Sequence, residues 1–360
     1  MCVDIMSVDL RKNILISGYY GDKNFGDEAI LYVLVQKLRN IAKNICVLSS
    51  DPKYTKEIYL VNSVYKFNLF EILKQTIKSQ VLISGGGSLL QDVTSLKSLL
   101  YYLFVIFIAL FFKKEVIIFA QGIGPINSKL GQFLTKILLK KAKLVTVRDI
   151  KSYELLKSWS IEAININDPI FGLSLPQNTP MNRVGIQLRK WKTLTAKFLE
   201  ELAFYVNKNF SHKEIYIYSL QDSYDMSVCQ EFAQNLLNIN PKIKLKIEHN
   251  LNVPDIISSF RNLDFMISMR FHGCLLALKY GIRTCALSYD QKVEKLANEL
   301  NIPYVNLNTD NDTNYNLDDV FKKLLCLDKR QLVNKVESIN FRFESIRDCL
   351  TKIKNKKNNT

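Results

Sequence analysis

One local pattern recurs along this chain and limits the folds that it can adopt. A short apolar run ends at a glycine or polar loop, and apolar residues then follow at helical spacing. Residues 13–17 (NILIS) stop at Gly18, after which Ile30, Leu34 and Leu38 repeat with the period of a helix. The same pattern follows the apolar runs 81–84, 115–120 and 144–147. Short strands alternating with helices predict a parallel sheet that is covered on both faces.

A lapse in this pattern predicts the domain boundary. Residues 173–180 (LSLPQNTP) are rich in proline and polar side chains, as is typical of a linker. A second series of apolar runs follows at 183–188, 214–220, 264–268, 283–288 and 304–307. Since 360 residues exceed what one hydrophobic core usually organises, we predict two Rossmann-like parallel-sheet domains facing a cleft. They comprise residues 1–172 and 181–345, and 346–360 form a basic tail to which we assign no fold.

Composition limits the partners and the compartment. The formal net charge of +15 predicts an anionic partner: a phosphorylated metabolite, a membrane surface or nucleic acid. Seven scattered cysteines without a CxxC pair, and a start that lacks a secretory signal, predict a reduced cytoplasmic protein. None of the three histidines has a second His or Cys at ligand spacing, so we expect no His/Cys metal site. The sequence does not exclude a magnesium site formed by carboxylates.

Residues 99–112 (LLYYLFVIFIALFF) form an unbroken apolar run that is followed by two lysines. The run is shorter than the roughly 20 residues that span a bilayer. It therefore predicts either a helix buried within the domain or a helix that docks on the membrane surface.

Three glycine-rich loops follow predicted strands of the first domain. Residues 18–28 (GYYGDKNFGDE) join a strand to a helix. Gly21 lies in this loop, and Asp27 or Glu28 could supply a carboxylate to a sugar hydroxyl, although a plain tight turn also accounts for the motif. Residues 84–92 (SGGGSLLQD) contain three consecutive glycines, which predict a backbone site for an anion or a sugar edge, with a ligand-free crossover as the alternative. The residues of interest in this second loop are Gly86, Gly87 and Asp92.

Two further strand ends complete the first domain. Residues 121–125 (QGIGP) predict a rigid loop in which Gln121 and Gly122 are candidate site residues. Arg148 follows an apolar strand and could present its guanidinium to a carboxylate or phosphate, although a structural salt bridge is equally open.

In the second domain, residues 268–273 (SMRFHG) lie between a strand and a helix predicted over 274–280. Arg270 and His272 would thus lie at a sheet's carboxyl edge and a helix N-terminus, which favour an anion beside a proton-transferring imidazole. Residues 288–293 (SYDQKV) follow the next strand and could bring Lys292 to the same edge, although an ordinary exposed lysine also fits.

Taken in order, these motifs, with the Asp168-Pro169 pair, resemble the series of the polysaccharide pyruvyl transferase family, CsaB type. The resemblance spans about residues 14–293. It implies a fold similar to GT-B glycosyltransferases, phosphoenolpyruvate as donor, and a pyruvyl ketal on a cell-wall or surface-polysaccharide precursor, usually lipid-linked. It also implies that Arg148, His272 and Lys292 serve the donor, that Arg270 assists, and that the N-terminal glycine loops contact the acceptor.

The expected chemistry uses no cofactor and no metal. His272 is the candidate general acid and base because imidazole titrates near neutral pH. Asp27 or Asp92 would deprotonate an acceptor hydroxyl. The expected location is the cytoplasm, at the inner membrane face if the acceptor is lipid-linked, with peripheral membrane contact.

Two other functions are consistent with some of the same motifs and with the charge. A GT-B glycosyltransferase that uses a nucleotide sugar would also need glycine loops and basic residues. A non-catalytic basic module for nucleic acid or membranes would account for the charge. It would leave the strand-end motifs unexplained, so we expect no nucleic-acid partner.

Overall fold

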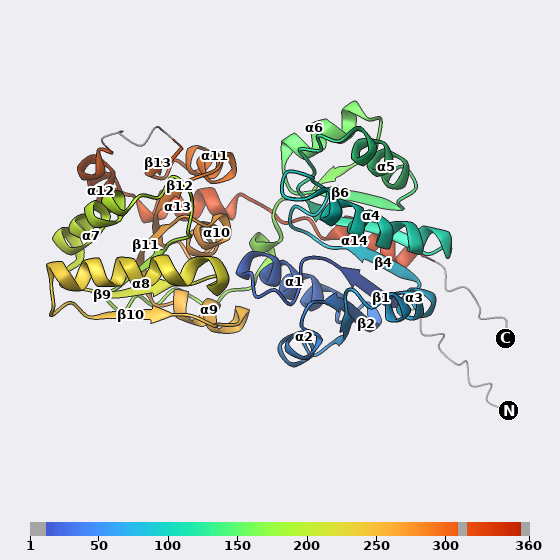
Figure 1. The fold of residues 1–360 in the computed structure, drawn as a ribbon, viewed down its shortest axis with the longest axis horizontal. Coiled ribbons are helices and arrows are strands. Elements are labelled where there is room, and N and C mark those ends of the chain that lie inside the picture. The colour runs from blue at the N-terminus through green and yellow to red at the C-terminus, as the bar shows by residue number, and fades with distance from the viewer. Residues whose placement is uncertain (1–11, 309–314, 354–360) are drawn as a thin grey trace. The chain divides into compact units, whose positions relative to one another are not determined.

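The fold is taken from a computed structural model that describes residues 12–308 and 315–353. These residues form two compact units, each built around one parallel sheet (Figure 1). The first unit contains residues 12–22, 27–172 and 340–353. The second contains Lys23–Gly26 and Leu173–Ile339.

The first sheet has seven strands in the order β3-β2-β1-β4-β5-β6-β7. Their bounds are β1 Lys12–Ser17, β2 Ala42–Ser49, β3 Asn62–Tyr65, β4 Val81–Ser84, β5 Glu115–Gln121, β6 Leu144–Val147 and β7 Ile164–Asn165. The chain runs outward from β1 to β3 and then returns to the other side of β1 at β4. Ligands of such sheets bind where the order reverses, beyond the carboxyl ends of the strands. In this unit that point lies between the loops after β1 and β4.

Helices cover both faces of the first sheet. They are α1 Phe25–Leu38, α2 Pro52–Tyr59, α3 Leu69–Lys78, α4 Leu96–Phe111, α5 Lys129–Leu139, α6 Ile150–Ser158 and α14 Glu344–Lys352. Alternate strand residues point to opposite faces, so Ile14 and Leu15 enter different cores. The core that contains Leu15 is closed by α3 to α6, and the core that contains Ile14 is closed by α1, α2 and α14.

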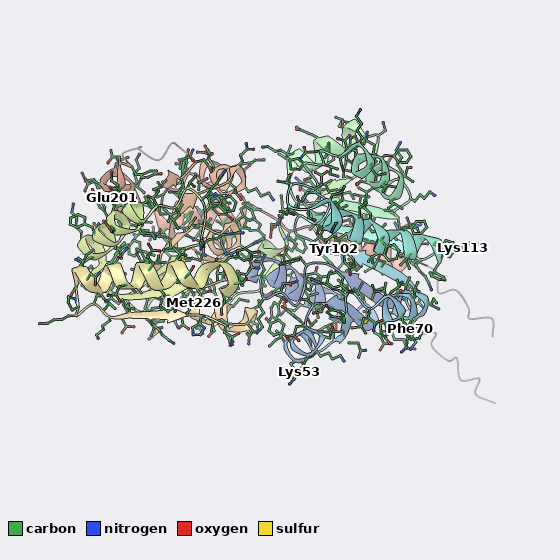
Figure 2. The ribbon with its side chains drawn as sticks, in the orientation of Figure 1. Lys53, Phe70, Tyr102, Lys113, Glu201 and Met226 are labelled. Atoms are coloured by element: carbon green, nitrogen blue, oxygen red, sulfur yellow. The ribbon has the colours of Figure 1, made fainter. Side chains whose placement is uncertain are left out.

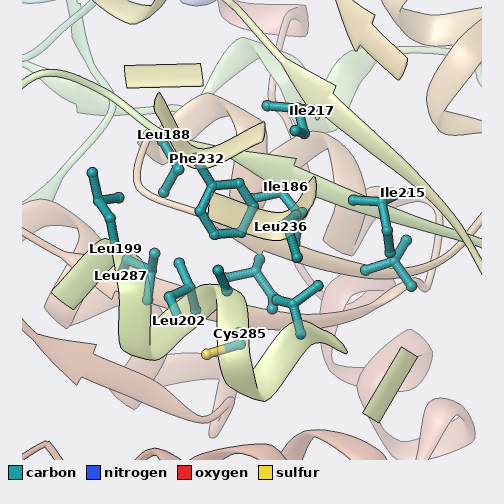
Figure 3. Packing of buried hydrophobic residues seen from close by; sticks show 14 of the residues in the cluster. Ile186, Leu188, Leu199, Leu202, Ile215, Ile217, Phe232, Leu236, Cys285 and Leu287 are labelled. Carbon is teal, nitrogen blue, oxygen red and sulfur yellow. The ribbon is translucent and has the colours of Figure 1, made fainter. Parts of the chain in front are cut away.

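The second sheet repeats this plan with six strands in the order β10-β9-β8-β11-β12-β13. The strands are β8 Arg183–Gln187, β9 Glu214–Tyr218, β10 Leu245–Glu248, β11 Leu263–Ser268, β12 Arg283–Ser288 and β13 Tyr304–Asn306. The helices are α7 Ala196–Phe210, α8 Asp222–Ile239, α9 Val253–Phe260, α10 Phe271–Lys279, α11 Gln291–Leu300, α12 Leu317–Cys326 and α13 Lys329–Glu337. Figure 3 shows the core between this sheet and its helices, where Phe232 packs near Ile186 and Leu236. The order reverses between β8 and β11.

The predicted fold class of two Rossmann-like parallel-sheet domains is confirmed. The assignment of the C-terminal segment is wrong. Residues 340–353 belong to the first unit, and α14 is a helix where we expected the tail to begin. Its apolar side chains Ile346 and Leu350 are buried in the core that contains Ile14, which composition alone does not reveal.

The apolar run 99–112 forms most of α4 and ends at its C-cap residue, Phe112, and neither of the two interpretations describes the run fully. One side of α4 is buried, whereas Phe104, Phe107 and Phe111 are exposed. Across the described parts of the chain, no helix has both the length and the apolar character needed to cross a membrane.

Candidate functional site

The glycine loops of the first unit meet at the carboxyl edge of its sheet. The Gly122 N–H donates to the Gly87 carbonyl at 2.7 Å, and the Gly124 N–H donates to the Leu90 carbonyl at 2.8 Å. A β-bridge also joins Gly87 to Gln121. The loops after β4 and β5 therefore form one continuous backbone surface. Sequence separation alone does not show this pairing.

Glycine is required at two positions of these loops. Gly87 has φ +96°, and a Cβ built there would lie 2.5 Å from an Asp27 carboxylate oxygen. Gly21 has φ +83°, and its Cβ would lie 2.2 Å from Ser49 Oγ. Both residues combine a left-handed backbone with a close polar neighbour. Asp27, in the first turn of α1, thus lies against the triple-glycine loop.

Arg148 is fixed beside the same loops. Its Nη1 forms a 2.9 Å ion pair with Asp168, and its Nη2 donates to Ser88 Oγ at 3.2 Å. The two charged side chains are only 8% and 5% exposed, so this pair is not an ordinary surface salt bridge. Arg148 thereby joins the second glycine loop to the Asp168-Pro169 segment.

Asp92 is not suited to deprotonating a hydroxyl. Its two carboxylate oxygens accept hydrogen bonds from the backbone N–H groups of Asn127 and Ser128, each at 2.7 Å. These bonds lower the pKa of Asp92. We therefore correct its assignment from a candidate base to a residue that holds the loop before α5.

Glu28, the second acid of the first glycine motif, is fully buried beside Asp27. Glu28 accepts hydrogen bonds from the Gly21 N–H at 2.7 Å and from the Tyr59 hydroxyl. Burial outweighs these bonds and raises its pKa to about 7. A carboxyl group that titrates near neutrality can exchange protons under cellular conditions.

Changing Glu28 to glutamine should remove a pH dependence of stability. The pKa of about 7 in the fold exceeds the ordinary value of 4.5, so the folded state binds the proton more tightly. Protonation of Glu28 therefore adds to the free energy of unfolding of the wild type, fully below pH 4.5. This added stability, about 3 kcal/mol, is lost as the pH rises through 7. Glutamine does not ionise, and its amide can still bond to the Gly21 N–H and to the Tyr59 hydroxyl. Urea unfolding of both proteins from pH 5 to 8 measures the difference.

A matched control is Glu57→Gln, at an exposed position of the neighbouring helix α2. Its unfolding free energy should follow the wild type at every pH. Parallel curves for the wild type and Glu28→Gln would contradict the raised pKa of Glu28.

Arg270 lies at the order reversal of the second sheet and is held by a buried ion pair. Its Nε and Nη2 bond to the Asp225 carboxylate at 2.8 and 2.6 Å, and Nη2 also bonds to Gln221 Oε1. Its backbone N–H donates to Gln187 Oε1 at the end of β8, at 2.7 Å. The side chain is thereby fixed in orientation, and Nη1 stays outside this network.

His272 lies in the first turn of α10, because this helix begins at Phe271 and not at the predicted residue 274. Arg270 is the N-cap residue and forms no side-chain cap. The first turn contains no acidic residue that would compensate the N-terminal dipole. The imidazole therefore lies at a helix N-terminus, where the helix dipole favours an anion.

The short segment Lys23–Gly26 of the first glycine motif belongs to this second unit. The Phe25 N–H donates to the Leu220 carbonyl at 3.0 Å, and Lys23 Nζ bonds to Asn250 at 3.2 Å. A Cβ at Gly26 would lie 2.1 Å from His272 Nδ1, so glycine leaves room for the imidazole.

Lys292 occupies the start of α11, which follows β12, the strand beside β11. The side chain of Asp290 caps this helix by accepting from the N–H groups of Lys292 and Val293, both at 2.9 Å. Asp290 therefore caps α11 with its side chain, whereas Arg270 forms no side-chain cap on α10. Lys292 itself is exposed.

Arg189, two residues after β8, was missed and lies at the same edge. Its guanidinium carbon lies 5.2–5.7 Å from the ring centroids of Trp191, Tyr224 and Tyr289. Its backbone N–H contacts the sulfur of Met269, and its buried Nε has no hydrogen-bond partner. An oriented arginine between aromatic rings is a typical site for a planar anion. An arginine immediately after the strand at 183–188 was the available signal.

The candidate residues thus divide between the two units. The first unit contains Asp27, Gly86, Gly87, Gln121, Gly122 and Arg148, and the second contains Arg189, Arg270 and His272.

A hollow of about 920 Å³ lies elsewhere, at the amino ends of β6 and β7, and is lined by Lys140 and Lys157 among others. Within the described residues, no group of three or more His, Cys, Asp or Glu side chains is placed to hold a metal ion.

Two α/β units with matching strand orders and loop-rich carboxyl edges define a GT-B-like fold. The chain belongs to the polysaccharide pyruvyl transferase family, whose model matches residues 24–291. The family predicted from the motifs is therefore confirmed.

Solved structures with the same fold include enzymes of other activities. A Listeria monocytogenes protein assigned as a UDP-N-acetylglucosamine 2-epimerase has a TM-score of 0.65 at 9% identity, covering 94% of this chain and 95% of its own. A glycosyltransferase from Rickettsia africae has a TM-score of 0.59 at 15% identity, covering 96% and 100%. The UDP-GlcNAc 2-epimerase of Neisseria meningitidis has a TM-score of 0.59 at 13% identity, covering 94% and 99%. Such identities establish the fold alone. No curated protein matches the chain.

Proposed function

We propose that this protein transfers the pyruvyl group of phosphoenolpyruvate to two hydroxyls of a saccharide, forming a ketal and releasing phosphate. Family membership supports pyruvyl transfer to a polysaccharide precursor. The observation that carries the donor assignment is the carboxyl edge of the second sheet. There, Arg270 is the N-cap residue of α10, His272 lies in the first turn of that helix, and Arg189 follows the neighbouring strand β8.

Phosphoenolpyruvate places a carboxylate and a phosphate on one small carbon frame, so its site needs several separated positive groups. Arg189 contributes a guanidinium held among aromatic rings, and α10 contributes the positive end of its dipole. Arg270 contributes Nη1, with Asp225 fixing its orientation. We propose that Arg148 and Lys292 add further donor contacts, as the family resemblance implies.

The chemistry consists of proton transfers around one carbon. A proton adds to the methylene carbon C3, which leaves C2 as a cation stabilised by its oxygen. One acceptor hydroxyl attacks C2 and loses its proton. The C2–O bond to phosphate then breaks, and a second hydroxyl attacks the new cation and loses its proton. Of the two hydroxyl protons, one balances the new methyl group and one leaves with phosphate.

His272 is the proposed acid and base for these transfers, because imidazole can accept and donate a proton near neutral pH. On the acceptor side, we propose that Asp27 or Glu28 receives a hydroxyl proton beside the glycine loops. Gln121, Gly86 and Gly122 would bind sugar hydroxyls. The proposed location is the cytoplasmic face of the membrane, where a lipid-linked acceptor is accessible. No redox step occurs in this scheme.

Incubation with phosphoenolpyruvate and a panel of glycolipid and soluble saccharide acceptors tests the proposal. Mass spectrometry should find an acceptor that gains one pyruvyl group, with equimolar phosphate release. The solved relatives with this fold include UDP-sugar enzymes, so UDP-sugars belong in the same panel. Transfer of a sugar from a UDP-sugar, with no pyruvyl transfer to any acceptor, would overturn the proposal.

Replacing Arg189 by lysine should weaken phosphoenolpyruvate binding about 10- to 100-fold. Lysine keeps the charge but lacks the planar group that lies among the rings. It also loses the second charge-assisted hydrogen bond that a guanidinium can form with the ligand. The fluorescence of Trp191, whose ring lies 5.4 Å from the Arg189 guanidinium, offers a titration signal.

Arg183→Lys is the matched control, because Arg183 lies at the other end of β8 and also stacks on a ring, that of Tyr216. Its phosphoenolpyruvate affinity should equal that of the wild type. An unchanged affinity in Arg189→Lys would remove Arg189 from the donor site.

A further inference from the structure

The outer sides of α4 and α5 carry large apolar side chains that face solvent. On each helix they recur at positions i, i+3 and i+7 and so line one stripe. These residues, which we call the apolar face, are Phe104, Phe107, Phe111, Leu130, Phe133 and Ile137. Each is 39–69% exposed. Single exposed apolar residues need no explanation, but two matching stripes do.

The two stripes form part of one surface. The buried sides of both helices enter the same core, which contains Ile106 of α4 and Leu138 of α5, and the helices pack against each other. Their exposed sides therefore point away from the same face of the sheet. The neighbouring helix α3 also packs on α4 and adds Phe70, which is 73% exposed. Figure 2 shows Phe70 and Lys113 on the outside of the first unit.

The charge around the apolar face is almost entirely positive. Residues 93–148 contain nine lysines and arginines and a single acid, Glu115. Neither α4 nor α5 contains an acidic residue. Lys113 follows the end of α4, and Lys140 and Lys141 follow the end of α5, all of them exposed. Over half of the net charge of +15 thus belongs to this part of the chain.

We propose that the apolar face docks the protein peripherally on an anionic lipid bilayer, with these lysines contacting the headgroups. Aromatic and aliphatic side chains would enter the boundary between headgroups and acyl chains. With 16 residues, α4 is about 24 Å long, which is too short to cross a hydrocarbon core of about 30 Å. This inference deepens the proposed function, because a lipid-linked acceptor would lie at the same surface.

A second copy of the chain fits the apolar face less well. A two-fold interface places the same patch on both partners, so the lysines at the helix ends would meet lysines. That contact brings like charges together, whereas an anionic bilayer neutralises them.

Co-sedimentation of the full chain with vesicles tests the proposal. We expect binding to vesicles of phosphatidylcholine with one third phosphatidylglycerol, and weaker binding to phosphatidylcholine alone. Phe107→Ser with Phe111→Ser should lower the partition coefficient at least tenfold. The control Phe204→Ser changes an equally exposed phenylalanine on α7 and should leave binding unchanged.

Lys140→Gln with Lys141→Gln should weaken binding to the anionic vesicles about fivefold per lysine. The charge-matched control is Lys197→Gln with Lys242→Gln, at exposed positions of the second unit. Absence of wild-type binding, or equal losses in the controls, would overturn the docking surface. A dimer in light scattering that the phenylalanine changes dissociate would assign the apolar face to a second copy.

The two proposals fail in different ways. Transfer of pyruvyl to a soluble saccharide, without vesicles, should be the same for the wild type and the docking variants. Transfer without vesicle binding would refute the docking surface alone. Vesicle binding without pyruvyl transfer to any acceptor would refute the proposed function alone.

Discussion

Replacing His272 by alanine should lower the rate of pyruvyl transfer by about 10²- to 10⁴-fold, the usual contribution of a general acid or base. The imidazole lies in the first turn of α10 beside the proposed donor site. Alanine keeps the helix and removes the proton carrier. Phosphate release under saturating phosphoenolpyruvate measures the rate, and circular dichroism checks that the fold is retained.

His212→Ala provides the control, because His212 is an exposed histidine in the loop before β9. Its activity should equal that of the wild type. If His272→Ala released phosphate at a near-normal rate, the imidazole would have no part in proton transfer.

Replacing Asp225 by alanine should destabilise the second unit by about 3–5 kcal/mol. The change leaves the Arg270 guanidinium buried without its carboxylate, and an unpaired buried charge is costly. Arg270 is only 8% exposed on its side chain and Asp225 not at all, so water cannot replace the lost bonds without rearrangement. Urea unfolding, followed by the fluorescence of Trp191, measures the loss.

Two further variants isolate the cause of this loss. Asp318→Ala removes an exposed carboxylate that bonds to two lysines and should cost less than about 1 kcal/mol. Asp225→Leu combined with Arg270→Met replaces both charges by apolar groups and should recover most of the stability. The double variant should still bind phosphoenolpyruvate poorly, because Arg270 Nη1 is gone. Equal losses for the exposed and buried aspartates would contradict this account of the ion pair.

Most strands that the sequence predicted are largely buried, whereas the strands that it missed are partly exposed. The central strands β1, β4, β5 and β11 are buried on both faces and read as continuous apolar runs. Edge strands β3 and β10 are partly exposed, and their mixed sequences resemble loops. Strand β2 also begins with polar, exposed residues.

The gathering of the loops at one edge of the first sheet could be predicted from the sequence. The loops at Gly87, Gln121 and Arg148 are in contact because parallel strands end at one edge, as the pattern implied. The partner of Arg270 was not predictable, because Asp225 lies 45 residues away on a helix whose orientation the sequence does not specify. The raised pKa of Glu28 likewise depends on burial by distant residues.

The placement of α14 has a consequence for the order in which the protein is synthesised. The first unit is built from both ends of the chain, since Phe343, Ile346 and Leu350 complete a core that Ile14 begins. The whole second unit, to Ile339, leaves the ribosome before this helix does. Until then, one face of the first sheet stays partly uncovered. The N-terminal half of the chain is therefore the last to finish folding, and a fragment ending at residue 339 would expose that face to aggregation.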